Sequence, residues 1–234
     1  GDLTVTVLPD ALRDLATNEN SVAFSHSQAV DTQTVDLDVT PAAGLFIGSN
    51  SEVRLFDKDG QKLAASTTLD PATGQVTITV TPNDTYPNGY RGPVLVEVHD
   101  NDPNPDYIDE FTGVGVSLSD GTAEYVMRAV LNVTEPGETS VTVSPVTEIA
   151  VTKLFEGLDG GPLVATDVDA FNDGVGKIFG IDDIVKTKAT VVNSALVEQT
   201  TGADVDDFDP TDGVSAAEKY GQVLAMLSAR DSES

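Results

Sequence analysis

The side chains best suited to chemistry are concentrated in residues 99–110, directly after an apolar run. The segment reads His-Asp-Asn-Asp-Pro-Asn-Pro-Asp-Tyr-Ile-Asp-Glu. Carboxylate and amide oxygens are the ligands that Ca²⁺ prefers, and it takes about six to eight of them at flexible geometry. The two prolines stiffen the segment and so reduce the entropy lost when a cation gathers its side chains. We therefore predict that calcium is bound by Asp100, Asp102, Asn104, Asp106, Asp109 and Glu110. The alternative is a solvated acidic loop whose aspartates serve its own turns.

A second acidic cluster occupies residues 204–213, before a predicted C-terminal helix. Taking Asp207 as position one of a calcium loop puts Asp209 at position three and Glu218 at position twelve. An aspartate stands where such a loop has its glycine, and no helix is predicted to enter the loop. Asp207 and Asp209 are therefore candidate cation ligands. A plain acidic helix entry explains the pattern equally well, because Glu218 can instead cap the helix together with Ser215.

The charge balance limits the classes of partner. Lys and Arg number 12 against 39 Asp and Glu, which gives a formal net charge of -27. Such a surface repels phosphate backbones and anionic lipid headgroups, so we expect no nucleic-acid partner and no membrane insertion. Bound divalent cations or high external salt would offset the self-repulsion, which favours an extracellular location. The chain has no cysteine, so disulfides and thiolate metal sites are excluded.

Catalysis has little support in the residue types. His26 and His99 are the only histidines, and neither lies in a recognised catalytic pattern. A carboxylate pair for glycoside hydrolysis remains an alternative in so acidic a chain. Tryptophan, the usual wall of a sugar-binding cleft, is absent. We expect a protein that is not an enzyme.

Two tyrosines are candidates for ligand contact. Tyr107 and Tyr90 lie in turn or loop segments beside acidic or glycine residues. In such places a phenol offers rigid contact area together with a hydrogen bond. The alternative for Tyr90 is that it covers the end of a sheet, as loop tyrosines near prolines often do.

The elements that must position these residues are mostly strands. Apolar residues alternate with polar ones in short runs separated by Asp-, Gly- and Pro-rich turns, a pattern typical of an antiparallel β-sandwich. These runs are residues 3–8, 34–39, 52–56, 75–81, 94–99, 113–118, 124–133 and 139–144. We predict a β-sandwich over residues 1–144 and a helical extension over residues 145–234 that packs on it as one cooperative unit.

Helical spacing begins after Ser144, which is a candidate N-cap followed by proline. Thr166 and Ser215 each precede an acid by three residues, the spacing of a capping box, and Gly180 closes the second helix. We predict three amphipathic helices with apolar stripes. Their members are Val146, Ile149, Ala150 and Leu154, then Phe171, Val175, Ile178 and Phe179, then Ala217, Tyr220, Val223, Leu224 and Leu227.

An ordered set of short motifs resembles a known family. Residues 90–96 read Tyr-Arg-Gly-Pro-Val-Leu-Val, residues 107–113 Tyr-Ile-Asp-Glu-Phe-Thr-Gly, and residues 144–150 Ser-Pro-Val-Thr-Glu-Ile-Ala. They resemble the Y-x-G-P-V-L-V strand, Y-x-D-E-x-T-G turn and T-P-L-T-E-L-A helix start of a sandwich module in large bacterial surface proteins. These proteins include calcium-dependent RTX-type adhesins. The resemblance covers roughly residues 55–228.

The resemblance implies a module from the ligand-binding region of such an adhesin. Its partners would be a surface glycan or peptide of a host or neighbouring cell and the adjacent domains of the same adhesin. Two roles remain open: gripping the ligand through bound calcium, or serving as a non-binding scaffold or spacer that positions neighbouring domains. A carbohydrate-active enzyme is the second alternative. We expect the module to be a monomer.

Overall fold

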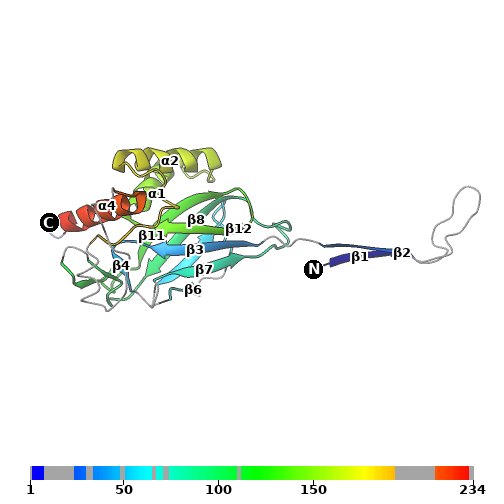
Figure 1. The fold of residues 1–234 in the computed structure, drawn as a ribbon, viewed down its shortest axis with the longest axis horizontal. Coiled ribbons are helices and arrows are strands. Elements are labelled where there is room, and N and C mark those ends of the chain that lie inside the picture. Colours follow the sequence, from blue (N-terminus) through cyan, green and yellow to red (C-terminus); the bar gives the residue numbers. More distant parts are fainter. Residues whose placement is uncertain are drawn as a thin grey trace, which may run out of the picture.

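The chain combines small β-sheets with long helices (Figure 1). The computed structural model describes residues 2–7, 24–29, 34–47, 51–64, 67–70, 74–109, 112–192 and 214–231. The strands are β1 Asp2–Val7, β2 Phe24–Ala29, β3 Val35–Pro41, β4 Leu45–Phe46, β5 Glu52–Phe56, β6 Thr67–Thr68, β7 Val76–Val80, β8 Gly92–Asp100, β9 Tyr107–Ile108, β10 Gly115–Val116, β11 Tyr125–Val133 and β12 Gly137–Val143. The helices are α1 Pro145–Leu158, α2 Ala165–Phe179 and α4 Ala216–Asp231. Each alternating run therefore contains a strand, as predicted, while β2, β4, β6 and β9 were not predicted.

The largest sheet has the strand order β11-β8-β5-β6 and is antiparallel throughout. Its strand β8 is buried along almost its whole length. One face of β8 sends Val94, Val96 and Val98 into the main core, while Leu95 on the other face packs beneath the helices. A strand covered on both faces needs apolar residues at successive positions, which explains the run Val-Leu-Val at residues 94–96.

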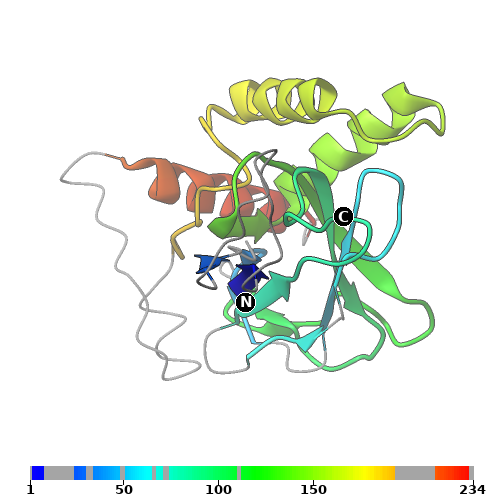
Figure 2. The ribbon, with the colours of Figure 1, turned by 90° about the vertical axis from the view of Figure 1, so that its right-hand side faces the viewer.

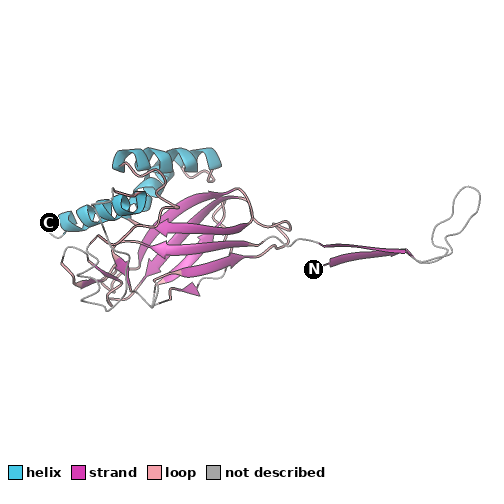
Figure 3. Cartoon of the chain, viewed as in Figure 1, coloured by secondary structure: helices cyan, strands magenta, loops and turns pink. Residues whose placement is uncertain are grey.

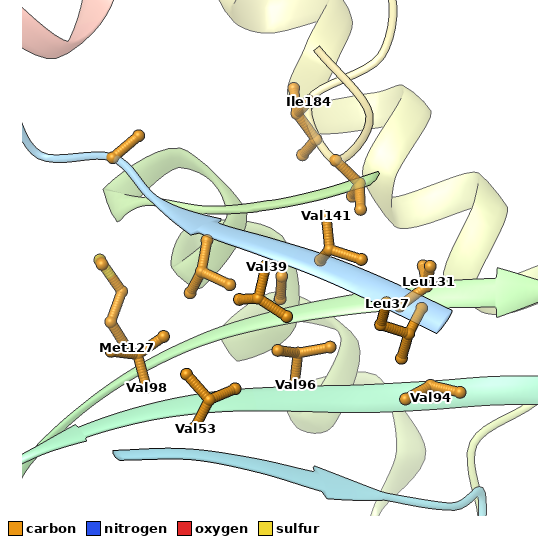
Figure 4. Close-up of a cluster of buried hydrophobic side chains, with 14 of the residues drawn as sticks. Leu37, Val39, Val53, Val94, Val96, Val98, Met127, Leu131, Val141 and Ile184 are labelled. Carbon is orange, nitrogen blue, oxygen red and sulfur yellow. The ribbon is translucent and has the colours of Figure 1, made fainter. Parts of the chain in front are cut away.

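A three-stranded sheet of order β12-β3-β7 supplies the facing side of the main core. Strand β3 alternates strictly between buried and half-buried positions, with Val35, Leu37 and Val39 in the core. Figure 4 shows Leu37 and Val39 near the valines of β8. The expectation of purely antiparallel pairing is wrong here, because β12 pairs with β3 in parallel. A long connection separates these two strands, so no hairpin fixes their direction.

Two smaller sheets complete the described strands. Strands β10, β9 and β4 form one of them, at the end of the body where the acidic segment 99–110 lies. Strands β1 and β2 form an antiparallel ribbon that projects away from the other sheets (Figure 1). Figure 3 shows the same separation between this ribbon and the helix-covered part of the chain.

Helix boundaries follow the capping residues with one exception. Ser144 caps α1 by accepting hydrogen bonds from the amides of Val146 and Thr147, and Gly180 ends α2 in a left-handed conformation. Ser215 caps α4, since its hydroxyl accepts the amide of Glu218 at 3.2 Å and that carboxylate accepts the amide of Ser215 at 2.7 Å. The capping box predicted at Thr166 is wrong, because α2 already begins at residue 165, after an N-cap that makes no side-chain hydrogen bond.

The helices share the core of the strands. Helices α1 and α2 lie together on one side of the sheets (Figures 1 and 2). Val146, Ala150, Val175 and Tyr220 belong to the same buried cluster as the valines of the two large sheets. Two predicted stripe residues face solvent instead: Ile149 is 37% exposed and Ile178 is 78% exposed. No helix in the described part of the chain is both long and apolar enough to cross a membrane.

Candidate cation site at the end of the central sheet

The acidic segment 99–110 begins where β8 ends and folds back against residues 115–119. The amide of Asp106 donates to the carbonyl of Val116 at 2.9 Å, and the Ser117 hydroxyl donates to the carbonyl of Asp102 at 3.1 Å. The amide of Ser119 donates to the Asp100 carboxylate at 3.0 Å. These bonds hold a short loop whose two ends bring Asp100 and Asp106 together.

Asp100 and Asp106 form a buried carboxyl pair. They are 1% and 2% exposed, and their carboxyl groups interact directly. Asp106 accepts hydrogen bonds from the Leu118 amide at 2.8 Å and from the Ser51 hydroxyl at 3.0 Å. Ser119 supplies the amide that Asp100 accepts. All of these donors are neutral, so they orient the two carboxyl groups without cancelling their charge.

The electrostatics of the pair favour a bound cation or a proton. Burial raises the pKa of Asp106, and the neighbouring Asp100 raises it further. The hydrogen bonds from the Leu118 amide and the Ser51 hydroxyl act in the opposite direction and lower this pKa. Within the described ranges, neither Asp100 nor Asp106 forms an ion pair with a lysine, arginine or histidine. Two adjacent buried carboxylates are costly unless positive charge is supplied from outside the protein.

The other predicted ligands are directed differently. Asp102 is half-buried and accepts the amide of Asn104 at 2.7 Å, while Asn104 itself is exposed. Asp109 is buried, and one of its oxygens accepts the Thr112 amide at 2.7 Å. Its other oxygen accepts the hydroxyl of Ser228 on α4. The segment therefore separates into a buried pair, a half-buried turn and a carboxylate tied to a helix. Glu110, Asp207 and Asp209 lie outside the described residues.

The cage of converging carboxylates that the sequence suggested is not formed by the residues described. Among them, no group of three or more histidines, aspartates and glutamates is gathered in a way that could hold a metal ion. A cation at Asp100 and Asp106 would need its remaining ligands from hydroxyl, carbonyl and water oxygens. Calcium accepts such a mixed set, and the Ser117 hydroxyl lies 3.5 Å from an Asp106 carboxylate oxygen and donates to the Asp102 carbonyl. The residues present thus fit calcium through two carboxylates.

Tyr90 cannot serve as a ligand contact, which corrects the prediction from sequence. Its side chain is 2% exposed, and its hydroxyl donates to the Pro93 carbonyl at 2.5 Å. Its ring packs edge-on against Tyr86. The residue closes the end of the core, as the alternative interpretation had it. Tyr107 lies in β9, half-buried against the same core, and its role as a ligand contact stays a prediction.

A network of charged side chains beside the pair was not predicted. His99 contacts Glu97 at 2.8 Å and Glu124 at 3.0 Å, and Arg54 contacts Glu52 at 2.7 Å. The strand register places Glu52 opposite His99 across β5 and β8. In the sequence, Glu52 and Arg54 of β5 and Glu97 and His99 of β8 stand at alternate positions, and this spacing could have indicated cross-strand pairing. Arg54 and His99 are thus paired with glutamates, and neither forms an ion pair with Asp100.

Comparison with known protein families, with curated proteins and with solved structures gives no match for this chain. The resemblance to adhesin modules therefore rests on the sequence motifs alone. Function must then be inferred from the chemistry of the residues themselves.

Proposed function

We propose that this chain is a calcium-dependent, extracellular module of a bacterial cell-surface adhesin that contributes to ligand binding on a target surface. The observation that carries the proposal is the buried pair of Asp100 and Asp106, whose hydrogen-bond donors among the described residues are all neutral. We further propose that the two large sheets form a β-sandwich that holds this pair at its end. The motifs shared with RTX-type adhesins support the same assignment.

Calcium binding would stabilise this part of the fold by removing a repulsion. Desolvation penalises each carboxylate of the pair, and their mutual repulsion adds to that penalty. A divalent ion supplies the missing positive charge and prefers carboxylate and carbonyl oxygens over nitrogen. The net charge of -27 also raises the local concentration of cations around the chain.

The ligand we propose is a surface glycan or peptide of a host or neighbouring cell. Asp102 and Asn104 lie on the more exposed part of the loop, outside the buried pair. A calcium ion bound on its protein side by Asp100 and Asp106 can complete its coordination with a carboxylate or a sugar diol from such a ligand. In this role Tyr107 would provide contact area near the loop. We propose no catalytic function.

A scaffold or spacer role is the second candidate. The bond between Asp109 and Ser228 ties the acidic loop to helix α4. A cation in this loop would then stiffen the joint between the sheets and the helix, which suits a module that positions adjacent domains of the same adhesin. Calcium would stabilise the chain in both roles, so stability alone does not separate them.

Isothermal titration with CaCl₂ after removal of metal tests the cation site. We expect saturable binding that Asp106→Asn abolishes. Asp120→Asn is the matched control, because it makes the same chemical change on an exposed neighbouring turn. Heat identical to that of buffer for the unmodified chain would refute the calcium proposal.

A glycan and peptide array, run with calcium and with EGTA, then separates the two roles. Calcium-dependent hits support ligand binding. Calcium binding without any hit on the array supports the scaffold.

A further inference from the structure

A cavity of about 430 Å³ lies where the turn 57–60 meets the connection between α1 and α2. We infer that it is a second ligand site, specific for a neutral sugar ring. The strand register pairs Phe56 with Leu95 and Glu52 with His99, so this turn and Asp100 lie at opposite ends of β5 and β8. The site is therefore separate from the proposed cation site.

The cavity is held open by hydrogen bonds of the turn. The Asp57 carboxylate accepts the amides of Asp59 at 2.9 Å and Gln61 at 2.8 Å, and it also accepts the Tyr86 hydroxyl at 2.6 Å. The amide of Leu163 donates to the Lys58 carbonyl at 2.9 Å, which joins the turn to the α1–α2 connection. Since the walls are joined directly, a ligand would meet a preformed site and lose little ordering entropy.

The floor of the cavity is apolar and includes one aromatic ring. Leu95 and Leu163 are buried members of the cluster beneath the helices, and Phe155 of α1 packs half-buried against it. The guanidinium of Arg128 lies 5.3 Å from the centre of the Phe155 ring and helps to fix it. This floor can cover an apolar ligand face, because binding removes both surfaces from water.

The rim offers one hydrogen-bond donor and one acceptor side by side. Lys58 and Asp59 form an ion pair at 2.6 Å, and both side chains are about half exposed, at 49% and 50%. Gly160 and Gly161 form another part of the wall, where the absence of side chains exposes the backbone to a ligand. Hydroxyl groups at the edge of a ligand could therefore bond to carboxylate, ammonium and backbone groups together.

These features match the chemistry of a neutral pyranose. The net charge of -27 disfavours an anion, and at the rim Lys58 and Asp59 cancel each other's charge in their ion pair. A pyranose has an apolar face of C–H groups and a rim of hydroxyls, which match the floor and the rim. The volume lies within the range of about 300–1,000 Å³ that is usual for small-molecule sites.

The inference goes beyond the proposed function, because binding in this cavity requires no calcium. We would titrate the ¹⁵N-labelled chain with methyl glycosides of glucose, galactose, mannose, N-acetylglucosamine and fucose, in calcium and in EGTA. The amides of Gly60, Gly160 and Gly161 report directly on the cavity. We expect at least one glycoside to shift these amides with the same Kd in both buffers.

The variants Asp59→Ala and Phe155→Leu test the rim and the floor separately. Each should raise Kd by about tenfold, the cost of losing one hydrogen bond or the stacking face. Lys153→Ala is the control, since this exposed residue of α1 pairs with Glu156 and does not line the cavity. A circular dichroism melt checks that each variant is folded, and Asp59→Ala changes only an exposed side chain.

Three results would overturn the inference. The first is that no glycoside shifts the three glycine amides, and the second is an unchanged Kd in both cavity variants. The third is binding that disappears in EGTA or in Asp106→Asn. That last result would assign sugar binding to the acidic loop, and so support the proposed function while removing this second site.

Discussion

Replacing Asp106 by asparagine should change thermal stability in opposite directions with and without calcium. Without calcium, the substitution removes one of two adjacent buried charges while keeping the shape of the side chain. The amide oxygen can still accept the Leu118 amide. The Ser51 hydroxyl, which now donates to the carboxylate, can instead accept from the new amide group. That amide group can also donate to the Asp100 carboxylate, which exchanges a repulsion for a hydrogen bond.

The magnitudes follow from these contacts. A hydrogen bond to a charged group contributes about 1.5 kcal/mol or more, and for a chain of this size each kcal/mol moves Tm by about 2–4 °C. Asp106→Asn should therefore raise Tm by about 3–6 °C in EGTA. Calcium at about 100 times its Kd should add about 2.7 kcal/mol to the unmodified chain, or about 5–11 °C, and nothing to the variant.

Differential scanning calorimetry in EGTA and in millimolar calcium measures both effects, with Asp120→Asn as the exposed control. The order of the melting temperatures should reverse between the two buffers. If the variant melts lower in both, Asp106 is only a hydrogen-bond acceptor and the repulsion argument is wrong. If the unmodified chain melts alike in both, the calcium site itself is refuted.

Four further predictions concern pH and packing. Because the pKa of Asp106 is raised in the native state, its contribution to stability is present at low pH and lost as pH rises through that pKa. Urea unfolding in EGTA should therefore show the advantage of Asp106→Asn shrinking on acidification. Tyr220→Phe should lower the free energy of unfolding by about 1–3 kcal/mol in urea titrations, since its buried hydroxyl bonds a hydroxyl at 2.6 Å and a carbonyl at 2.9 Å. Gly221→Ala should cost about 1–3 kcal/mol or more in the same assay, because a Cβ there would overlap the Thr190 carbonyl oxygen. Gly174→Ala, a helical glycine with open space around it, should instead gain up to about 1 kcal/mol.

Local patterns predicted most of the elements because local physics determines them. The strict alternation of β3 and the Ser215 cap of α4 each depend on a few neighbouring residues. The capping box at Thr166 was wrong because α2 begins at residue 165, before that threonine. The parallel pairing of β12 with β3 could not be predicted from local patterns, because it depends on a crossover connection and not on a turn.

The candidate site was predicted in composition and not in arrangement. Six oxygen-bearing side chains in one segment indicated a cation, but the sequence could not say which of them would be buried together. That outcome depends on Ser51 and Leu118, which are distant from Asp106 in the chain yet donate hydrogen bonds to it. Similarly, Tyr90 looked available in a turn, whereas its hydroxyl is used by the Pro93 carbonyl.

The distribution of basic side chains leaves the buried pair without an ion partner among the described residues. Among the described residues, Arg54 pairs with Glu52 of β5 and with Glu124 just before β11, and Arg128 pairs with Glu148 where α1 meets β11. Lys58 and Lys153 each pair with a nearby acid on the surface. With only 12 basic residues against 39 acidic ones, pairing within the chain leaves most carboxylates to solvent. Exposed carboxylates tolerate this because water and salt screen them, but Asp100 and Asp106 are shielded from both. The acid excess is therefore most costly at this buried pair, where we propose that calcium supplies the positive charge at neutral pH and a proton does so at low pH.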